Sequence, residues 1–232
     1  MPSGKDVKIQ ICGVTSADDA RLVAQAGADY VGLIIEVDAS PRRLSVEQAG
    51  QICRQSPLPV VAMFFNREVE QIGKTVALLR PHAVQLLGQE PPSLVEKLKQ
   101  VVDCEVWKSV HLPAQGMGEV NITEYQDRIN SMVDAGIDAI IIDTVVGSTQ
   151  EDRRYGGTGQ VSNWTIARKI VDGAPVRCFL AGGIKPENVR QAIEQVSPYG
   201  LDISSGVESA PGKKDPEKMK RLVLAARGID PQ

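Results

Sequence analysis

The sequence of 232 residues predicts a single (β/α)8 barrel (TIM barrel) of about the minimum size for that fold, with one domain over residues 1–232. Short apolar, β-branched segments alternate strictly with amphipathic segments of helical periodicity, and this alternation requires parallel strands joined by helical crossovers. Eight segments of each kind occur along the chain. A doubly wound open sheet usually has fewer strands and one glycine-rich dinucleotide turn, so the closed barrel is favoured.

The segments expected as strands are residues 7–12, 30–35, 60–65, 83–87, 105–110, 139–142, 176–180 and 201–204. The segments expected as helices are residues 17–26, 46–55, 68–79, 93–102, 123–135, 162–171, 186–196 and 216–226. Several helices carry boundary signals. These signals are Thr15 or Ser16 before an Asp-Asp pair, Ser45 three residues before Gln48 as a capping box, Pro186-Glu187 as a first turn, and Gly27 after the first helix.

The composition is that of an ordinary globular protein, with 42% hydrophobic residues, 24% charged residues and a net charge of -3. Lysine and arginine are dispersed among acidic residues, which argues against a nucleic-acid partner. Residues 1–5 lack the apolar stretch of a signal peptide, and no run approaches the roughly 18 apolar residues that span a bilayer. We therefore expect a cytoplasmic protein with no membrane association.

Four cysteines without CxxC spacing and two distant histidines argue against a disulfide framework and against a zinc site. We expect no metal and no cofactor. An important cysteine is then more plausible as a free thiol than as a ligand or a disulfide partner.

Three glycine-rich loops follow the later strands, at the end of a barrel where the active site lies. They contain Gly157 and Gly159, then Gly182 and Gly183, then Ser204, Ser205 and Gly206. Glycine lets the backbone approach an oxyanion closely, and helix N-termini add unpaired N–H donors. Any one of these loops also suits an ordinary tight turn. Together they predict a phosphate site and a phosphorylated small-molecule substrate.

Two side chains at strand ends are candidates for proton transfer. Cys12 ends the first strand; it is either a small core residue or, with a lowered pKa, a base for a carbon acid. Asp143 follows an apolar run; it either caps the next loop or, with a pKa raised by burial, acts as a general acid. Together above a phosphate site they suggest an aldose–ketose isomerisation that uses neither a metal nor a redox cofactor.

Lys108 offers a competing chemistry, because a lysine at a barrel strand end can form a Schiff base with a carbonyl substrate. A structural or phosphate-facing lysine is the other interpretation of this residue, and it is the one we favour.

The assembled motifs resemble those of the phosphoribosylanthranilate isomerase family of tryptophan biosynthesis, from Ile11 nearly to the C-terminus. The matching motifs lie at residues 11–15, 26–29, 40–42, 83–86, 143–144, 156–159, 181–189, 202–208 and 211–215. The resemblance implies that Asp143 protonates the furanose ring oxygen and that Cys12 removes the C2' proton of the resulting Schiff base. It also implies that Arg42 pairs with the anthranilate carboxylate through its planar fork. The glycine-rich loops would hold the 5'-phosphate.

The sequence departs from the family pattern around the same site. Gln10 stands where the family usually has lysine, and Leu87 where it usually has histidine. Leu33 and Ile35 replace a phenylalanine pair, and residues 162–164 read Ser-Asn-Trp instead of Phe-Asp-Trp. Losing the lysine and the histidine is expected to raise the Cys12 pKa and leave less thiolate. Losing aromatic residues is expected to reshape the aryl pocket.

Two other functions therefore stay open beside the tryptophan-pathway isomerase. One is a related barrel isomerase for another aminated phosphosugar, and the other is a non-catalytic protein that binds a phosphate ligand. The loops at residues 111–121 and 145–155 are longer than the compact family pattern, and either is a candidate lid. The sequence is compatible with a monomer or a homodimer.

Overall fold

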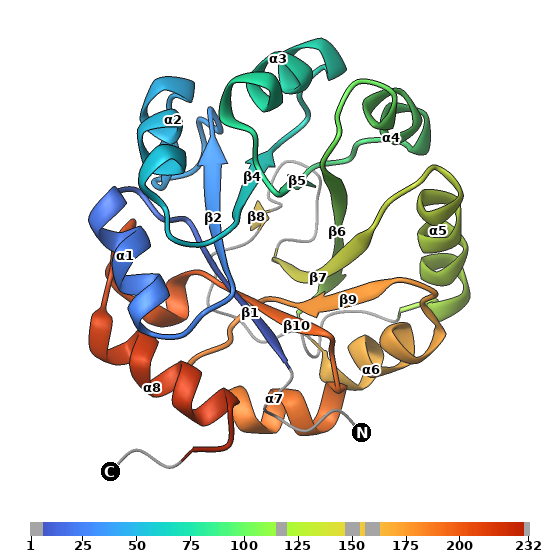
Figure 1. Ribbon diagram of the computed structural model, residues 1–232. Coiled ribbons are helices and arrows are strands. Elements are labelled where there is room, and N and C mark those ends of the chain that lie inside the picture. Colours follow the sequence, from blue (N-terminus) through green and yellow to red (C-terminus); the bar gives the residue numbers. More distant parts are fainter. Residues whose placement is uncertain (1–6, 115–119, 147–153, 156–162, 230–232) are drawn as a thin grey trace.

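The computed structural model describes residues 7–114, 120–146, 154–155 and 163–229, and in these residues the parallel strands close into a barrel (Figure 1). The barrel strands are β1 (Lys8–Cys12), β2 (Tyr30–Ile35), β4 (Val60–Phe64), β5 (Ala83–Leu86), β6 (Glu105–Pro113), β7 (Ala139–Val146), β9 (Arg177–Leu180) and β10 (Gly200–Ile203). Closure follows from β1, which pairs in parallel with β10 on one side and with β2 on the other. The predicted (β/α)8 barrel is confirmed.

Within the described residues, eight helices surround the strands in chain order (Figure 1). They are α1 (Ala17–Gln25), α2 (Val46–Gln55), α3 (Val69–Leu79), α4 (Pro92–Lys99), α5 (Ile122–Asp134), α6 (Trp164–Gly173), α7 (Val189–Val196) and α8 (Pro216–Ala226). The structure also contains short elements that the sequence did not predict. These are β3 (Arg43–Leu44), β8 (Arg154–Tyr155), the 3-10 helix η1 (Ser205–Val207), β11 (Glu208–Ala210) and β12 (Lys213–Lys214).

The predicted boundary signals hold for the first two helices. Ser16 caps α1 by accepting a hydrogen bond from the Asp19 amide, and Ser45 and Gln48 form a complete capping box at α2. Gly27 has a φ of 86°, which a residue with a side chain rarely adopts.

The prediction that Pro186 and Glu187 open α7 was wrong, because the helix begins at Val189. The Asn188 side chain forms hydrogen bonds with the backbone of the residues just before the helix. Its Oδ1 accepts from the Lys185 amide at 2.9 Å, and its Nδ2 donates to the Gly183 carbonyl at 2.9 Å. These bonds hold residues 185–188 in a turn.

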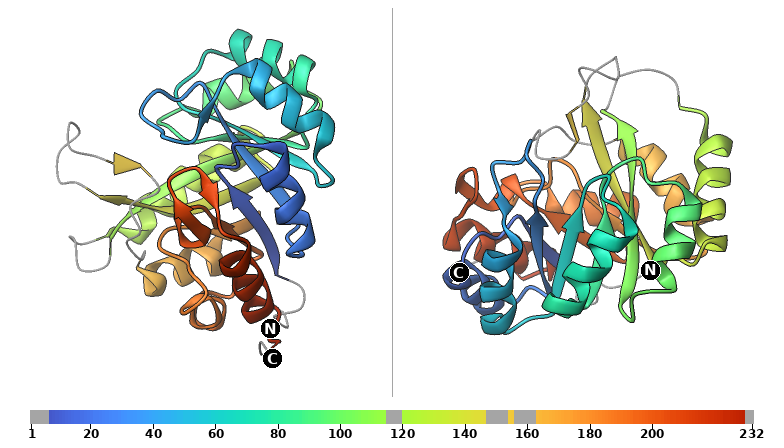
Figure 2. Two further views of the ribbon diagram at one scale, coloured as in Figure 1. Left: turned by 90° about the vertical axis from the view of Figure 1, so that its left-hand side faces the viewer. Right: turned by 90° about the horizontal axis from the view of Figure 1, so that it is seen from above.

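Strands β6 and β7 are longer than the sequence predicted and project past the other strands (Figure 2). Their pairing continues from Trp107 and Ala139 to Pro113 and Val145. Part of each expected lid loop is therefore strand. Residues 115–119 and 147–153 of the two loops lie outside the described residues.

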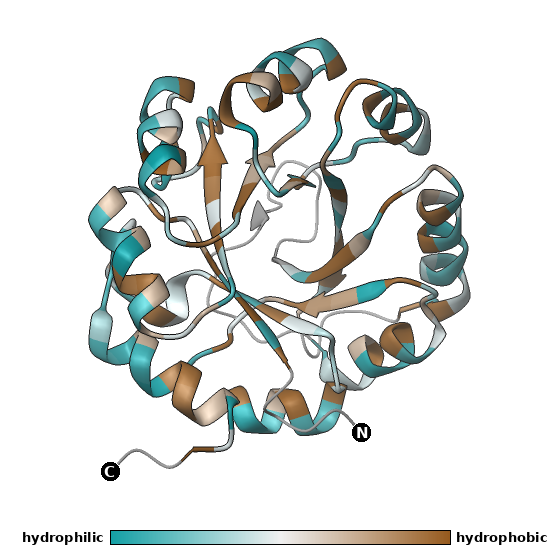
Figure 3. Ribbon diagram, in the orientation of Figure 1, coloured by the Kyte–Doolittle hydropathy of each residue, from teal (hydrophilic) through white to brown (hydrophobic). Residues whose placement is uncertain are grey.

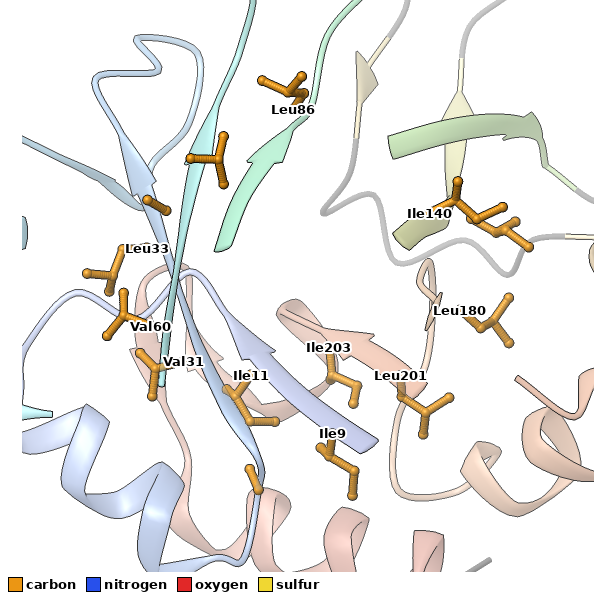
Figure 4. Packing of buried hydrophobic residues seen from close by; sticks show 14 of the residues in the cluster. Ile9, Ile11, Val31, Leu33, Val60, Leu86, Ile140, Leu180, Leu201 and Ile203 are labelled. Carbon is orange, nitrogen blue, oxygen red and sulfur yellow. The ribbon is translucent and has the colours of Figure 1, made fainter. Parts of the chain in front are cut away.

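The core has two layers, one between the strands and the helices and one inside the barrel. Hydropathy colouring shows apolar strands and helices that are apolar toward the barrel and polar toward solvent (Figure 3). Figure 4 shows residues of the outer layer, including Ile9 and Ile11 of β1 and Leu201 and Ile203 of β10. The alternate positions face the interior of the barrel. Gln10, Cys12 and Asp202 therefore lie on its inner side.

Candidate active site

Cys12 lies at the C-terminal end of β1, and its side chain is buried inside the barrel. Its thiol donates a hydrogen bond to the Met63 sulfur on β4 at 3.4 Å. Gly32 on β2 makes this contact possible, since a Cβ there would lie 3.0 Å from the Cys12 Cα and 3.1 Å from the Met63 Sδ. A side chain at position 32 would therefore crowd both Cys12 and Met63.

The environment of Cys12 favours the neutral thiol. Burial raises its pKa well above the usual value, and the negative charge of Asp202 acts in the same direction, with a smaller effect from Asp143. The positive charges of Lys214 and Arg42 lower it. The sequence argument attributed a raised pKa to the missing lysine and histidine, whereas the structure attributes it chiefly to burial.

Asp143 lies near the end of β7, opposite His111 in the β6–β7 register. Its Oδ1 accepts a hydrogen bond from the Thr144 amide at 2.7 Å. Burial raises the pKa of this carboxyl to about 6, although the Thr144 bond opposes the shift. A carboxyl with such a pKa is partly protonated near neutrality, as a general acid must be.

Asp202 on β10 is an ionisable group of the site that the sequence reasoning missed. Burial raises its pKa to about 7, and Asp143 adds to the shift. Its Oδ2 accepts a hydrogen bond from the Gln85 amide at 3.4 Å, and Gln85 in turn accepts one from Gln10 at 3.0 Å. Gln10, at the position of the family's lysine, thus belongs to an amide network inside the barrel. The signal available in the sequence was an acidic residue between apolar neighbours, Leu201 and Ile203.

Arg42 lies just before β3 and is already bound to a carboxylate of the protein. Its Nε and Nη2 donate to the two carboxylate oxygens of Glu208, at 2.8 and 2.6 Å. Such a two-point pair fixes the guanidinium plane. Nη1 takes no part in this pair.

The predicted phosphate loops after β9 and β10 lie against each other. Gly182 and Gly183 both have positive φ, 83° and 65°. A Cβ on Gly206 would collide with the Ile184 carbonyl oxygen, so only glycine lets the two loops approach this closely.

The same loops reach both proton-transfer candidates. The Ser204 Oγ lies 3.2 Å from where a Cβ of Gly13, next to Cys12, would be, and a Cβ on Gly182 would lie 3.3 Å from the Thr144 amide nitrogen. The structure therefore brings Gly182, Gly183, Ser204, Ser205 and Gly206 to one side of the barrel mouth. Gly157 and Gly159 lie outside the described residues.

Lys108 is completely buried and bonded within the protein, which supports its structural interpretation. Its ammonium donates to the Glu90 carboxylate at 2.9 Å and to the Gly88 carbonyl at 2.7 Å. Glu90 also accepts from the Asn66 amide at 2.8 Å, so the pair joins the loops after β4 and β5 to strand β6.

Replacing Lys108 with Met is expected to lower the free energy of unfolding by roughly 3–5 kcal/mol, because the buried Glu90 carboxylate loses its counter-ion. Urea denaturation would measure the change. The exposed Lys97→Met is the matched control and should cost less than about 0.5 kcal/mol. A Lys108→Met protein of unchanged stability but without activity would instead indicate a chemical role.

In the described part of the chain, no group of three or more His, Cys, Asp or Glu side chains is placed to hold a metal ion. The same residues contain no helix with the length and apolar character needed to cross a membrane.

Comparisons with known proteins agree on one family. The family model described as N-(5'phosphoribosyl)anthranilate (PRA) isomerase matches residues 9–225. A protein of Geobacter metallireducens named N-(5'-phosphoribosyl)anthranilate isomerase is 35% identical, over 95% of this chain and 99% of its own. A protein of the same name from Magnetococcus marinus is 36% identical, over 95% of both chains.

Solved structures agree with the sequence relatives. The phosphoribosyl anthranilate isomerase of Thermotoga maritima superimposes with a TM-score of 0.80 at 32% identity, covering 96% of this chain and 100% of that one. A phosphoribosyl anthranilate isomerase in complex with reduced 1-(o-carboxyphenylamino)-1-deoxyribulose 5-phosphate gives a TM-score of 0.77 at 31% identity, with the same coverage. The chain belongs to the N-(5'-phosphoribosyl)anthranilate isomerase family.

Proposed function

We propose that this chain isomerises N-(5'-phosphoribosyl)anthranilate to 1-(2-carboxyphenylamino)-1-deoxyribulose 5-phosphate in tryptophan biosynthesis, with Asp143 as the general acid and Cys12 as the general base. The observation that carries the residue assignment is the arrangement at the barrel mouth. A carboxyl whose pKa is raised to about 6 and a buried thiol lie on the inner side of the barrel, beside the glycine loops after β9 and β10.

The reaction needs two proton transfers of opposite direction. Asp143 gives its proton to the furanose ring oxygen, and the bond from that oxygen to C1' breaks as the anthranilate nitrogen lone pair forms the C=N bond. The Cys12 thiolate then takes the C2' proton, and the C2'–H electrons form the enolamine double bond. The enolamine tautomerises to the ketone, and exchange with solvent returns Asp143 and Cys12 to their starting forms.

Binding is assigned to the remaining candidates. Arg42, oriented by Glu208, would receive the anthranilate carboxylate on its Nη1 edge. The loops with Gly182, Gly183, Ser204, Ser205 and Gly206, together with Gly157 and Gly159, would hold the 5'-phosphate through backbone amides. We extend the proposal to a single domain over residues 1–232, a cytoplasmic location, and a monomer or homodimer.

Growth of a tryptophan auxotroph that lacks this isomerase tests the function. The wild-type gene should restore growth, and purified protein should remove the fluorescence of phosphoribosylanthranilate. Soluble expression without growth and without turnover contradicts the assignment. Turnover of another aminated pentose phosphate in the same assay would then indicate the related isomerase, and affinity without turnover would indicate the binding protein.

A further inference from the structure

A second buried lysine, Lys214 on β12, contacts the backbone of Cys12. Its side chain has no exposed surface, and its ammonium donates to the Cys12 carbonyl at 2.6 Å and to the Ser204 carbonyl at 3.4 Å. The third contact is with the Glu208 carboxylate at 2.9 Å. The ammonium therefore joins the end of β1, which carries Cys12, to the end of β10.

Glu208 accepts from two cations at once, Arg42 and Lys214. Burial acts to raise the pKa of its carboxyl, but the bonds from Arg42 and Lys214 outweigh burial, so the pKa is lowered. One negative charge thus faces two positive charges in a buried cluster. With all three groups ionised, the cluster of Arg42, Glu208 and Lys214 carries a net charge of about +1 next to the thiol.

Such a lysine is costly to bury. Burial lowers the pKa of the Lys214 ammonium, and Glu208 opposes that shift. A buried ion pair contributes little stability in itself, because desolvation offsets the attraction. A charge held at this cost beside a reactive group is the arrangement expected where the charge serves the chemistry.

We propose that Lys214 is a positioning residue for the base: it holds the strand end that carries Cys12 and supplies the positive charge that stabilises the Cys12 thiolate. This inference rests on the proposed role of Cys12 as the base.

The charged groups that face Cys12 divide into two pairs. Asp202 of β10 and Asp143 of β7 raise the pKa of the thiol, and Lys214 of β12 and Arg42 lower it. Arg42 is bound at two points to Glu208, whereas Lys214 gives Glu208 a single bond and directs others at the Cys12 and Ser204 carbonyls. Removing Lys214 therefore leaves Arg42, paired at two points with Glu208, as the remaining one of these two cations to oppose the two aspartates.

The expected pH profile of kcat/KM separates this role from a structural one. The reaction needs protonated Asp143 together with ionised Cys12, although Asp143 has the lower pKa. The profile should rise up to about pH 6, stay level, and fall only above the pKa of Cys12. On the level part, the rate is proportional to the small, constant fraction of molecules in which Asp143 is protonated and Cys12 is ionised. Each unit of increase in the Cys12 pKa therefore lowers the plateau about tenfold and moves the alkaline limb up by about one unit.

The experiment measures this profile and, separately, the titration of the thiol. The thiolate of Cys12 is followed by its ultraviolet absorbance, as the difference between each protein and the same protein carrying Cys12→Ser. Lys214→Met is expected to raise the titration midpoint by about one unit or more, lower the plateau at least about tenfold and shift the alkaline limb with the midpoint. Lys214→Arg should stay close to the wild type. Lys213→Met, at the exposed neighbouring position, is the matched control and should change nothing.

Glu208→Gln provides the opposite test, because it leaves both cations without their anion. The thiol midpoint should then fall. The Glu208→Gln variant also tests the proposal if Lys214→Met does not fold. A titration midpoint of Cys12 that is unchanged or raised in Glu208→Gln overturns the proposal. A folded Lys214→Met protein with a lower rate but an unmoved midpoint overturns it as well.

Failure of the proposed function gives a different result. If the midpoint of the thiol moves in Lys214→Met and the alkaline limb of kcat/KM does not, Lys214 controls the Cys12 charge but Cys12 is not the base. That outcome supports the electrostatic link and rejects the assignment of Cys12.

Discussion

Replacing Asp143 with Asn is expected to lower kcat by roughly 10²–10⁴-fold while making the folded protein more stable at alkaline pH. The amide keeps the shape of the side chain but has no proton to give to the ring oxygen of the substrate. Steady-state assays that follow the loss of substrate fluorescence would measure kcat and KM. KM should change little, because Asp143 is assigned to proton transfer and not to binding.

The stability change follows from the pKa of Asp143. The folded-state pKa is raised from 3.8 to about 6, so the carboxyl favours folding below about pH 4, and this contribution is lost as the pH rises through about 6. Asn does not ionise, so the Asp143→Asn protein does not lose this stability as the pH rises. Urea denaturation should show Asp143→Asn to be more stable than the wild type at about pH 8, by up to about 3 kcal/mol, and the difference should be smaller at about pH 4. An Asn variant with wild-type kcat would contradict the assignment of the acid.

The Cys12→Ala variant should also lose roughly 10²–10⁴-fold in kcat, because no thiolate remains to take the C2' proton. The loss should persist at every pH, unlike that of Lys214→Met, whose activity approaches that of the wild type above the thiol pKa. Cys12→Ser fills nearly the same space and should be equally inactive, since a hydroxyl is a much weaker acid than a thiol. The same fluorescence assay measures kcat for Cys12→Ala and for Cys12→Ser.

Folding must be separated from chemistry in these variants. The thiol of Cys12 contacts the Met63 sulfur, so its removal is expected to cost about 1 kcal/mol of stability, which urea denaturation would measure. If Cys12→Ala is folded and retains most of the wild-type kcat, the base is another group. Asp202, with a pKa of about 7 on the neighbouring strand, is then the residue to replace.

Local patterns in the sequence were sufficient for the architecture. Short apolar, β-branched segments and helical segments in strict alternation leave few alternatives to a parallel barrel, and all eight predicted strands and helices are present. The capping box at Ser45 and Gln48 was readable because its partners are three residues apart. Where a side-chain bond competes with a helix-start signal, as when Asn188 donates to the Gly183 carbonyl five residues before it, the predicted start of α7 was wrong. The extra length of β6 and β7 also depends on pairing between strands.

The sequence by itself determined the barrel, the family resemblance and the strand ends at which Cys12, Asp143 and the glycine loops occur, because these depend on short-range periodicity and motifs. Only the tertiary structure decided that Glu208 binds both Arg42 and Lys214, and that this cluster lies behind Cys12. The carboxylate of Glu208 and the guanidinium of Arg42 are 166 residues apart in the chain, and Lys214 is 202 residues from Cys12. No local pattern encodes such pairs. Burial, which sets the pKa values of Cys12, Asp143 and Asp202, likewise exists only once the strands have closed.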